Sequence, residues 1–204
     1  MSIRACFVSL VVAAAVVVGC ESRESLPASP SASDGGHTIS AAAPAQLAAK
    51  TDQGKTVELK DACDPETFND PVNGIGPGTC VVRNGGVRFQ TFLDQLSLHH
   101  SVGGWHMAPQ EVILQVGQVL SAFNNGGEVH TFTEVEDFGG GFVTMLNNLG
   151  GFGPTITECQ NPQSLEMLHP GDSSHEEEED AGVEKYQCCI HPWMRTIVRI
   201  VPAH

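Results

Sequence analysis

The sequence predicts an all-β fold, a sandwich or barrel, for residues 59–204. Two observations support this prediction: short segments rich in β-branched residues recur along the chain, and segments rich in glycine and asparagine separate them. The turn segments are Asn84–Gly86, Gly103–Gly104, Asn124–Gly127 and Gly139–Gly141. At 204 residues, the chain is expected to hold one such domain with extensions.

Four segments carry the strand pattern. Residues Glu111–Leu120 predict a strand, a break at Gly117 and the start of a second strand. Val129–Val135 and Val183–Gln187 predict two further strands, and Thr196–Val201 predicts the last.

Two segments depart from this pattern. In residues 89–98, Phe89, Phe92, Leu93 and Leu96 fit a helical stripe, and the pattern leaves helix and strand both open. Residues 173–182 contain five consecutive acidic residues, Glu176–Asp180, and predict an exposed loop.

The N-terminus has the pattern of an export signal. Arg4 precedes an apolar run, Cys6–Val18, that is too short to span a bilayer. The run ends in Val-Val-Gly-Cys20, which resembles a bacterial lipobox with cleavage before Cys20 and a lipid on its sulfur; a plain signal peptide is the alternative. We therefore expect residues 1–19 to be a lipoprotein signal peptide. The mature protein is expected in the periplasm or at the cell surface, with a lipid anchor in a membrane.

Residues 20–58 predict a lipidated cysteine followed by a flexible linker. The segment is rich in serine, alanine and proline and contains no aromatic residue, so it cannot bury enough apolar surface to fold. As a flexible coil it would span roughly 35 Å. The predicted domain therefore stands off the membrane without a fixed orientation.

The charge of the chain excludes one class of partner. With 24 acidic and 10 basic residues, the formal net charge is −14, whereas nucleic acid binding requires clustered lysine and arginine. The same acidity permits electrostatic steering toward a basic protein partner.

Seven cysteines divide into several roles. Cys6 lies in the signal peptide and Cys20 at the lipid site, which leaves Cys63, Cys80, Cys159, Cys188 and Cys189. An odd number in an exported domain indicates one thiol with another function. If Cys188 binds a metal as a thiolate, the other four can form the bridges Cys63–Cys80 and Cys159–Cys189. A bridge between the neighbours Cys188 and Cys189 is the alternative.

A cluster of metal-binding residues lies near the C-terminus. Cys188, His191 and Met194 stand in a C-x₂-H-x₂-M pattern between two predicted strands, and His130 follows a glycine-rich turn. One thiolate, two imidazoles and a weak thioether are the ligand set that selects copper in electron-transfer sites. A zinc site from Cys188, Cys189, His191 and His130 is the alternative, although it lacks the usual C-x₂-C pairs.

These motifs, in this order, resemble the cupredoxins, the blue-copper proteins of the plastocyanin, azurin and amicyanin group. The ligand loop Cys188–Met194 is similar to the short amicyanin-type loop, and the resemblance covers about residues 105–204. It implies an eight-stranded Greek-key β-sandwich that binds one type 1 copper ion. The implied ligands are His130, Cys188, His191 and Met194. It also implies one-electron transfer through the exposed edge of His191, with Pro192 and Trp193 as the apolar contact patch.

The sequence departs from the family in three places. Thr131 follows the first histidine, where better-known members have an asparagine that ties the two ligand loops together, and Cys189 lies inside the ligand loop. The stretch between His130 and Cys188 is long, because it includes the glycine-rich segment 138–152 and the acidic loop. An N-terminal extension closed by Cys63–Cys80 is expected to precede the sandwich. Gln187 precedes Cys188, where copper enzymes of this fold place a histidine, so we expect no enzyme. The expected partners are a redox protein such as a c-type cytochrome or a membrane oxidoreductase. The alternative function is copper handling or delivery in the periplasm.

Overall fold

The computed structural model describes residues 54–82, 85–178 and 180–203. The predicted signal peptide at 1–19, the predicted lipid site at Cys20 and the linker up to residue 53 lie outside these residues. Within the described ranges, no helix has both the length and the apolar character needed to cross a membrane.

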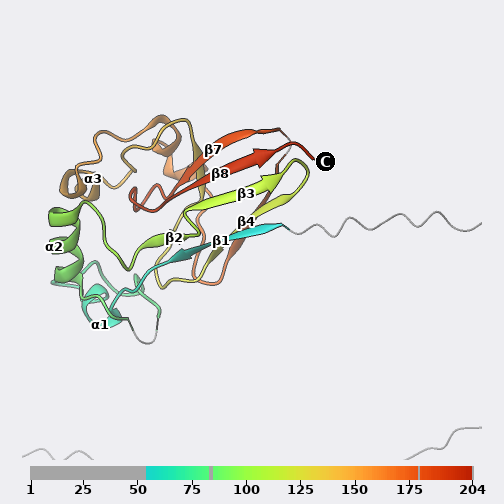
Figure 1. The fold of residues 1–204 in the computed structure, drawn as a ribbon. Helices are drawn as coiled ribbons and strands as arrows, with labels where there is room; N and C mark the ends of the chain where they lie inside the picture. Colours follow the sequence, from blue (N-terminus) through green and yellow to red (C-terminus); the bar gives the residue numbers. More distant parts are fainter. Residues whose placement is uncertain (1–53, 83–84, 179, 204) are drawn as a thin grey trace, which may run out of the picture. The chain divides into compact units, whose positions relative to one another are not determined.

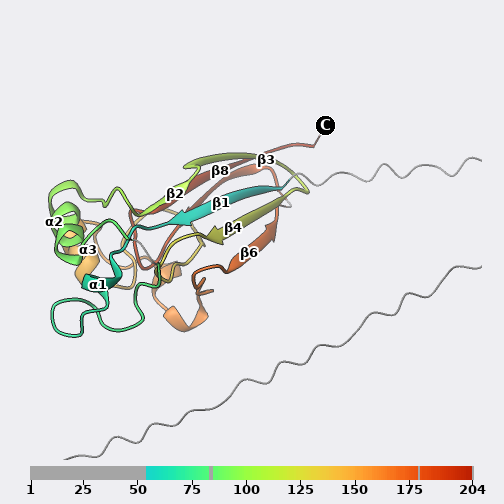
Figure 2. The same cartoon turned by 90° about the horizontal axis from the view of Figure 1, so that it is seen from below.

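Two four-stranded sheets face each other in the described part of the chain (Figures 1 and 2). The first has the order β2-β1-β4-β6, formed by His106–Ala108, Lys55–Lys60, Val119–Asn124 and Ser173–Glu177. The second has the order β3-β8-β7-β5, formed by Glu111–Gln115, Arg195–Val201, Gly182–Gln187 and Thr133–Val135. The pairs β1–β4 and β3–β8 are parallel and the others antiparallel. The predicted β-sandwich is confirmed.

The core of the sandwich follows from alternation along the strands. In β4 and β8, every second side chain is buried, as expected when one face of a sheet packs on the other sheet. Strand β1 also belongs to this core, because Val57 and Leu59 are fully buried. The strand begins at Lys55, so the fold starts earlier than the predicted boundary at residue 59.

The chain between β1 and β2 forms a cap segment, residues 61–105, at the end of the sandwich opposite the C-terminus (Figure 1). It contains the short helix α1, Pro65–Phe68, and the longer helix α2, Phe89–His99. The structure thus resolves the ambiguous segment as a helix. Phe92 and Leu96, four residues apart, are buried on one face of α2, and this burial stabilises it.

Aromatic rings hold the cap segment together. Phe68 lies 5.2–5.6 Å from the rings of Phe89, Phe92 and Trp105, measured between ring centroids. The disulfide Cys63–Cys80 closes the first part of the segment, and both cysteines are buried. The predicted disulfide-closed extension is therefore confirmed, and it packs as part of the same hydrophobic core as the sandwich.

Two parts of the chain differ from the sequence prediction. The segment predicted as an acidic loop begins as strand β6, which pairs with β4 through five residues while its side chains point mainly to solvent. Charged side chains on an edge strand hide the apolar alternation that identifies buried strands, and they discourage pairing with other chains. In the glycine-rich segment 138–152, helix α3, Thr144–Gly150, was not predicted. The Asn147 side chain braces it through two hydrogen bonds to the backbone of Gly141.

Candidate metal centre

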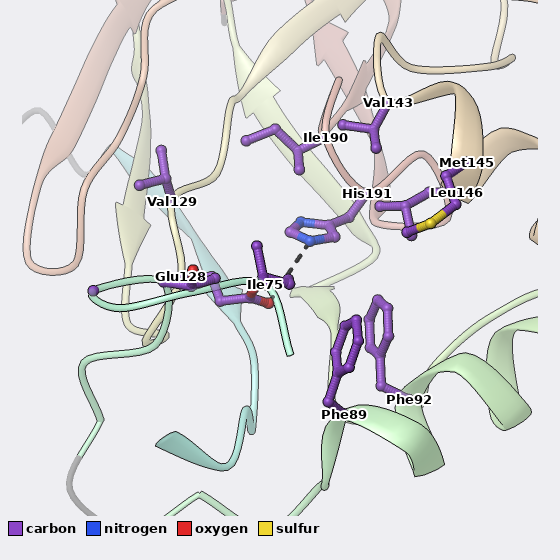
Figure 3. Close-up of a pocket in the computed structure, with 12 residues that line it drawn as sticks. Ile75, Phe89, Phe92, Glu128, Val129, Val143, Met145, Leu146, Ile190 and His191 are labelled. Carbon is purple, nitrogen blue, oxygen red and sulfur yellow. Dashed lines mark ion pairs between the residues drawn. The ribbon is translucent and has the colours of Figure 1, made fainter. Parts of the chain in front are cut away.

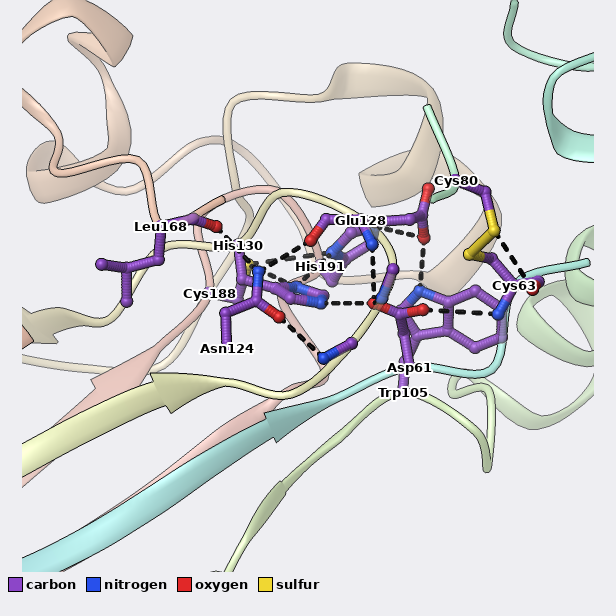
Figure 4. A network of polar contacts seen from close by, with 12 residues as sticks. Asp61, Cys63, Cys80, Trp105, Asn124, Glu128, His130, Leu168, Cys188 and His191 are labelled. Carbon is purple, nitrogen blue, oxygen red and sulfur yellow. Dashed lines mark hydrogen bonds and ion pairs between the residues drawn. A yellow bond between two sulfur atoms is a disulfide. The ribbon is translucent and has the colours of Figure 1, made fainter. Parts of the chain in front are cut away.

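Three segments of the chain meet at the cap end of the sandwich (Figure 4). The first is the loop that follows β4 and carries His130, and the second is the ligand loop 188–194 between β7 and β8. The third is Asp61, the residue directly after β1. Their side chains converge in a buried cluster.

The structure brings together Cys188, His130 and His191. The Cys188 sulfur lies 3.8 Å from Nδ1 of each imidazole, and the two Nδ1 atoms are 3.2 Å apart. All three side chains are buried, and one potential ligand atom from each lies within 4.8 Å of the others. These three atoms therefore surround a single point that a metal ion can occupy.

The outer nitrogen of His130 is held by a buried carboxylate. His130 Nε2 lies 2.9 Å from Oδ2 of Asp61, and neither side chain is exposed to solvent. Because the carboxylate can only accept, Nε2 carries a proton, and Nδ1 faces the cluster as the potential ligand atom. The ring is thus oriented toward the cluster before any metal binds.

Asp61 also organises the loop that carries His130. Its Oδ2 accepts hydrogen bonds from the backbone N–H groups of Gly127 and Glu128, at 2.8 and 2.9 Å. Burial by itself would raise the pKa of Asp61, but the hydrogen bonds from His130, Glu128 and Gly127 lower it to about 2. Asp61 is therefore an anion at neutral pH. The sequence prediction did not include it.

A second carboxylate faces His191. Glu128 Oε2 accepts a hydrogen bond of 2.6 Å from the indole N–H of Trp105 and lies 3.7 Å from His191 Nε2. Trp105 and Glu128 are both buried. Trp105 thus fixes the carboxylate beside the second imidazole, although the Glu128–His191 distance is longer than a hydrogen bond.

Thr131 joins the two ligand loops. Its backbone N–H donates to the Cys188 sulfur at 3.4 Å, and its hydroxyl oxygen accepts a hydrogen bond of 2.8 Å from the backbone of Cys189. An N–H donor to a metal-binding sulfur stabilises the thiolate and influences the metal it binds. The threonine therefore ties the loops together at the position where the family's asparagine was expected.

The predicted fourth ligand, Met194, closes the ligand loop. Its side chain is fully buried, and its carbonyl oxygen accepts a hydrogen bond of 3.0 Å from the backbone of Cys188. The Met194 N–H donates to the His191 carbonyl at 2.8 Å. These bonds hold Met194 at the base of the loop, and its role as a thioether ligand stays a prediction.

The cysteine pairing agrees with the sequence prediction. Cys159, in the 3-10 helix Thr157–Cys159, is bridged to Cys189, and Cys188 is the free, buried cysteine of the described residues. The bridge rules out two alternatives, a Cys188–Cys189 disulfide and a zinc site that includes Cys189, because the Cys189 sulfur is bonded to Cys159. It also anchors the residue next to the free thiol of Cys188.

Comparisons with known proteins find similarity among solved structures. No family model matches the chain, and no curated protein does. A purple cupredoxin from Nitrosopumilus maritimus is 22% identical over 49% of this chain and 86% of its own, with a TM-score of 0.35. A Cu(I) form of an amicyanin mutant is 17% identical over 47% of this chain and 73% of its own, with a TM-score of 0.33.

The architecture of this chain identifies the fold by itself. Two four-stranded sheets carry a thiol and an imidazole on the loop between the last two strands, and a second imidazole on an earlier loop. The fold is a cupredoxin sandwich. The cap segment supplies Asp61 and Trp105 around the candidate metal centre.

The surroundings of His191 bear on the contact patch that the family resemblance implies. His191 is only 4% exposed, Pro192 is buried and Trp193 is half-buried, and a partner contact at Pro192 and Trp193 stays a prediction. Trp193 packs against the rings of Phe92 and Phe152, with centroids 5.8 and 5.9 Å away. The sequence motif could not show this, because the covering residues come from distant segments.

The metal-free cluster is an ion pair. Burial would raise the pKa of Cys188, but hydrogen bonds from His130 and His191 hold it well below its usual range. Burial would lower the pKa of His130, but its contacts with Asp61 and with Cys188 raise it to about 9. At neutral pH the site therefore contains a thiolate and an imidazolium, and a metal must displace the proton on His130 Nδ1.

This proton predicts that metal affinity depends on pH. Copper affinity is expected to fall below pH 9, about tenfold per pH unit, because one proton competes for the ligand nitrogen. Titration against a Cu(I) chelator at pH 6, 7, 8 and 9, with a pH indicator, should show about one proton released per copper at pH 7. An affinity that is constant over this range would contradict the protonation of His130.

Proposed function

We propose that the chain is a type 1 copper protein that carries single electrons between redox partners. The observation that carries this proposal is the convergence of one thiolate and two imidazole Nδ1 atoms on a buried point. Thiolate and imidazole ligands suit copper, and Met194 lies in the same loop as a weak thioether ligand. When bound, copper would supply a one-electron couple between Cu(I) and Cu(II).

The protein's contribution is a rigid ligand set. Asp61 orients His130, Thr131 donates to the Cys188 sulfur, and the Cys159–Cys189 bridge anchors the ligand loop. Ligands fixed in this way move little between the two oxidation states, which favours fast electron exchange. The buried setting also keeps water from the metal.

The location and partners belong to the same proposal. The lipobox-like sequence at Cys20 supports a membrane tether, at the outer face of a bacterial cytoplasmic membrane or elsewhere in the periplasm. The net charge of −14 supports a basic redox partner, such as a c-type cytochrome, or a membrane oxidoreductase. We propose no catalytic reaction and no nucleic acid partner for this chain.

Copper handling in the periplasm is the second candidate. The observation that favours it is the burial of His191, which removes the exposed imidazole edge expected of a carrier. Reversible voltammetry with fast exchange between the copper protein and a cytochrome would support the carrier. Tight copper binding without a reversible couple, together with transfer to an acceptor apo-protein, would support copper delivery.

The ligand assignment predicts the spectrum of cysteine variants. Copper loading of the chain is expected to produce an intense blue, violet or green thiolate-to-copper absorption. Cys188→Ser should abolish this band, because it removes the thiolate. The double variant Cys159→Ser/Cys189→Ser should keep it, since those sulfurs are bonded to each other. Loss of the band in the double variant with retention in Cys188→Ser would overturn the assignment.

A further inference from the structure

A pocket of about 390 Å³ lies beside His191 (Figure 3). Its volume falls in the range of small-molecule sites in proteins. Four parts of the chain line it: the cap segment with α2, the loop after β4 at Glu128 and Val129, the start of α3, and the ligand loop at Ile190 and His191. The pocket therefore reaches a predicted copper ligand whose side chain is otherwise covered.

The walls of the pocket are mainly apolar. Phe89 and Phe92 of α2 lie on one side, and Val143 and Leu146 lie across from them (Figure 3). Met145, which is half exposed, is among the lining residues too. An apolar, partly aromatic wall favours a compact apolar ligand, above all a planar ring that can pack against phenyl groups.

Two polar groups restrict the class of ligand. Glu128 and His191 are the ionisable side chains among the described residues that line the pocket. The carboxylate and the net charge of −14 disfavour an anion. A hydroxyl group suits Glu128 in either protonation state, because it can donate to a carboxylate and accept from a carboxylic acid.

From these features we infer that the pocket binds a small neutral aromatic molecule that carries a hydroxyl group, a compound of the phenol or hydroquinone class. The ring lies against Phe89 and Phe92, and the hydroxyl points toward Glu128. Bound there, the molecule contacts the edge of His191. Under the proposed function, this contact makes the pocket the access point of a small redox compound. The binding itself does not depend on that function.

Binding can be tested with three probes of similar size: phenol, toluene and benzoate. We expect phenol to bind both the metal-free and the Cu(I)-loaded full chain, at least about tenfold more tightly than benzoate and more tightly than toluene. Methyl NMR spectra should show shifts at Ile75, Val143 and Ile190. Absence of phenol binding, equal binding of all three probes, or shifts confined to other methyl groups would each overturn the inference.

Two valine variants locate the site. Val143→Phe places a ring in the wall of the pocket and should weaken phenol binding at least about tenfold. Val183→Phe makes the same change on β7, where Val183 is exposed and does not line the pocket, and should leave binding unchanged. An equal effect of both changes would contradict the inference. If phenol binds as expected but no blue, violet or green band forms with copper, the proposed function fails and the binding site stands.

Discussion

Replacing Asp61 with asparagine is expected to raise the reduction potential of bound copper and to destabilise the metal-free protein. The aspartate is a buried anion held against Nε2 of the predicted ligand His130. A fixed negative charge near the metal favours Cu(II) over Cu(I), by roughly 1–2 kcal/mol if the effective dielectric constant is about 20. Its removal therefore favours Cu(I), which raises the potential.

The effect on stability has a defined pH window. The pKa of Asp61 is lowered to about 2 and that of His130 is raised to about 9 in the folded, metal-free protein. The aspartate's contribution is complete above about pH 4 and is lost as the pH falls toward 2. The histidine's contribution is complete below about pH 6.5 and is lost as the pH rises through 9. The pair thus stabilises the fold most between about pH 4 and 6.5.

Urea unfolding of the metal-free protein can measure this window. At pH 5.5 the Asp61→Asn variant should lose about 3 kcal/mol, the cost of leaving a buried charge without its partner. At pH 9.5 the loss should be smaller. Asp137→Asn is the matched control, since Asp137 pairs with Lys185 at the surface and is 86% exposed. Equal losses for the two variants, or an unchanged potential in Asp61→Asn, would show that Asp61 does not act on the metal centre.

The contact of Asp61 with His130 could not be predicted from the sequence. The predicted ligands Cys188, His191 and Met194 lie within seven residues, so their spacing alone brings them to one loop. Asp61 is 69 residues from His130. Nothing in the local sequence of either residue indicates that the end of β1 meets the loop after β4. That contact is a property of the folded sheets, in which β1 pairs with β4.

The burial of His191 could not be predicted from the sequence either, because it depends on long-range packing. The sequence predicted the disulfide Cys63–Cys80 and left the helix at 89–98 open, but it could not place either over the metal centre. Glu128 and Trp105 are adjacent only because the cap segment returns to β2 beside the His130 loop. Local patterns thus predicted both disulfides and the clustered residues His130, Cys188 and His191, whereas the groups that surround this cluster depend on long-range packing.

A large loss of stability is expected from truncation of Phe92 in the cap segment. Its side chain is 2% exposed, and its ring lies 4.8 Å from Trp105, 5.8 Å from Trp193 and 6.5 Å from His191, between ring centroids. Phe92→Ala should lower the free energy of unfolding by about 3–5 kcal/mol, because it removes buried apolar surface and leaves a cavity.

The Phe92 variant also tests whether the cap segment controls access to the metal centre. Leu98→Ala, on the same helix, is the control, because Leu98 is exposed and the change should alter stability by less than about 0.5 kcal/mol. In the copper-loaded protein, Phe92→Ala should keep the thiolate-to-copper band, since no ligand changes. Its copper should nevertheless exchange electrons faster with a bulky soluble reagent, because the aromatic wall beside His191 is gone. An unchanged rate would mean that electrons reach the copper by a route that does not pass the cap segment.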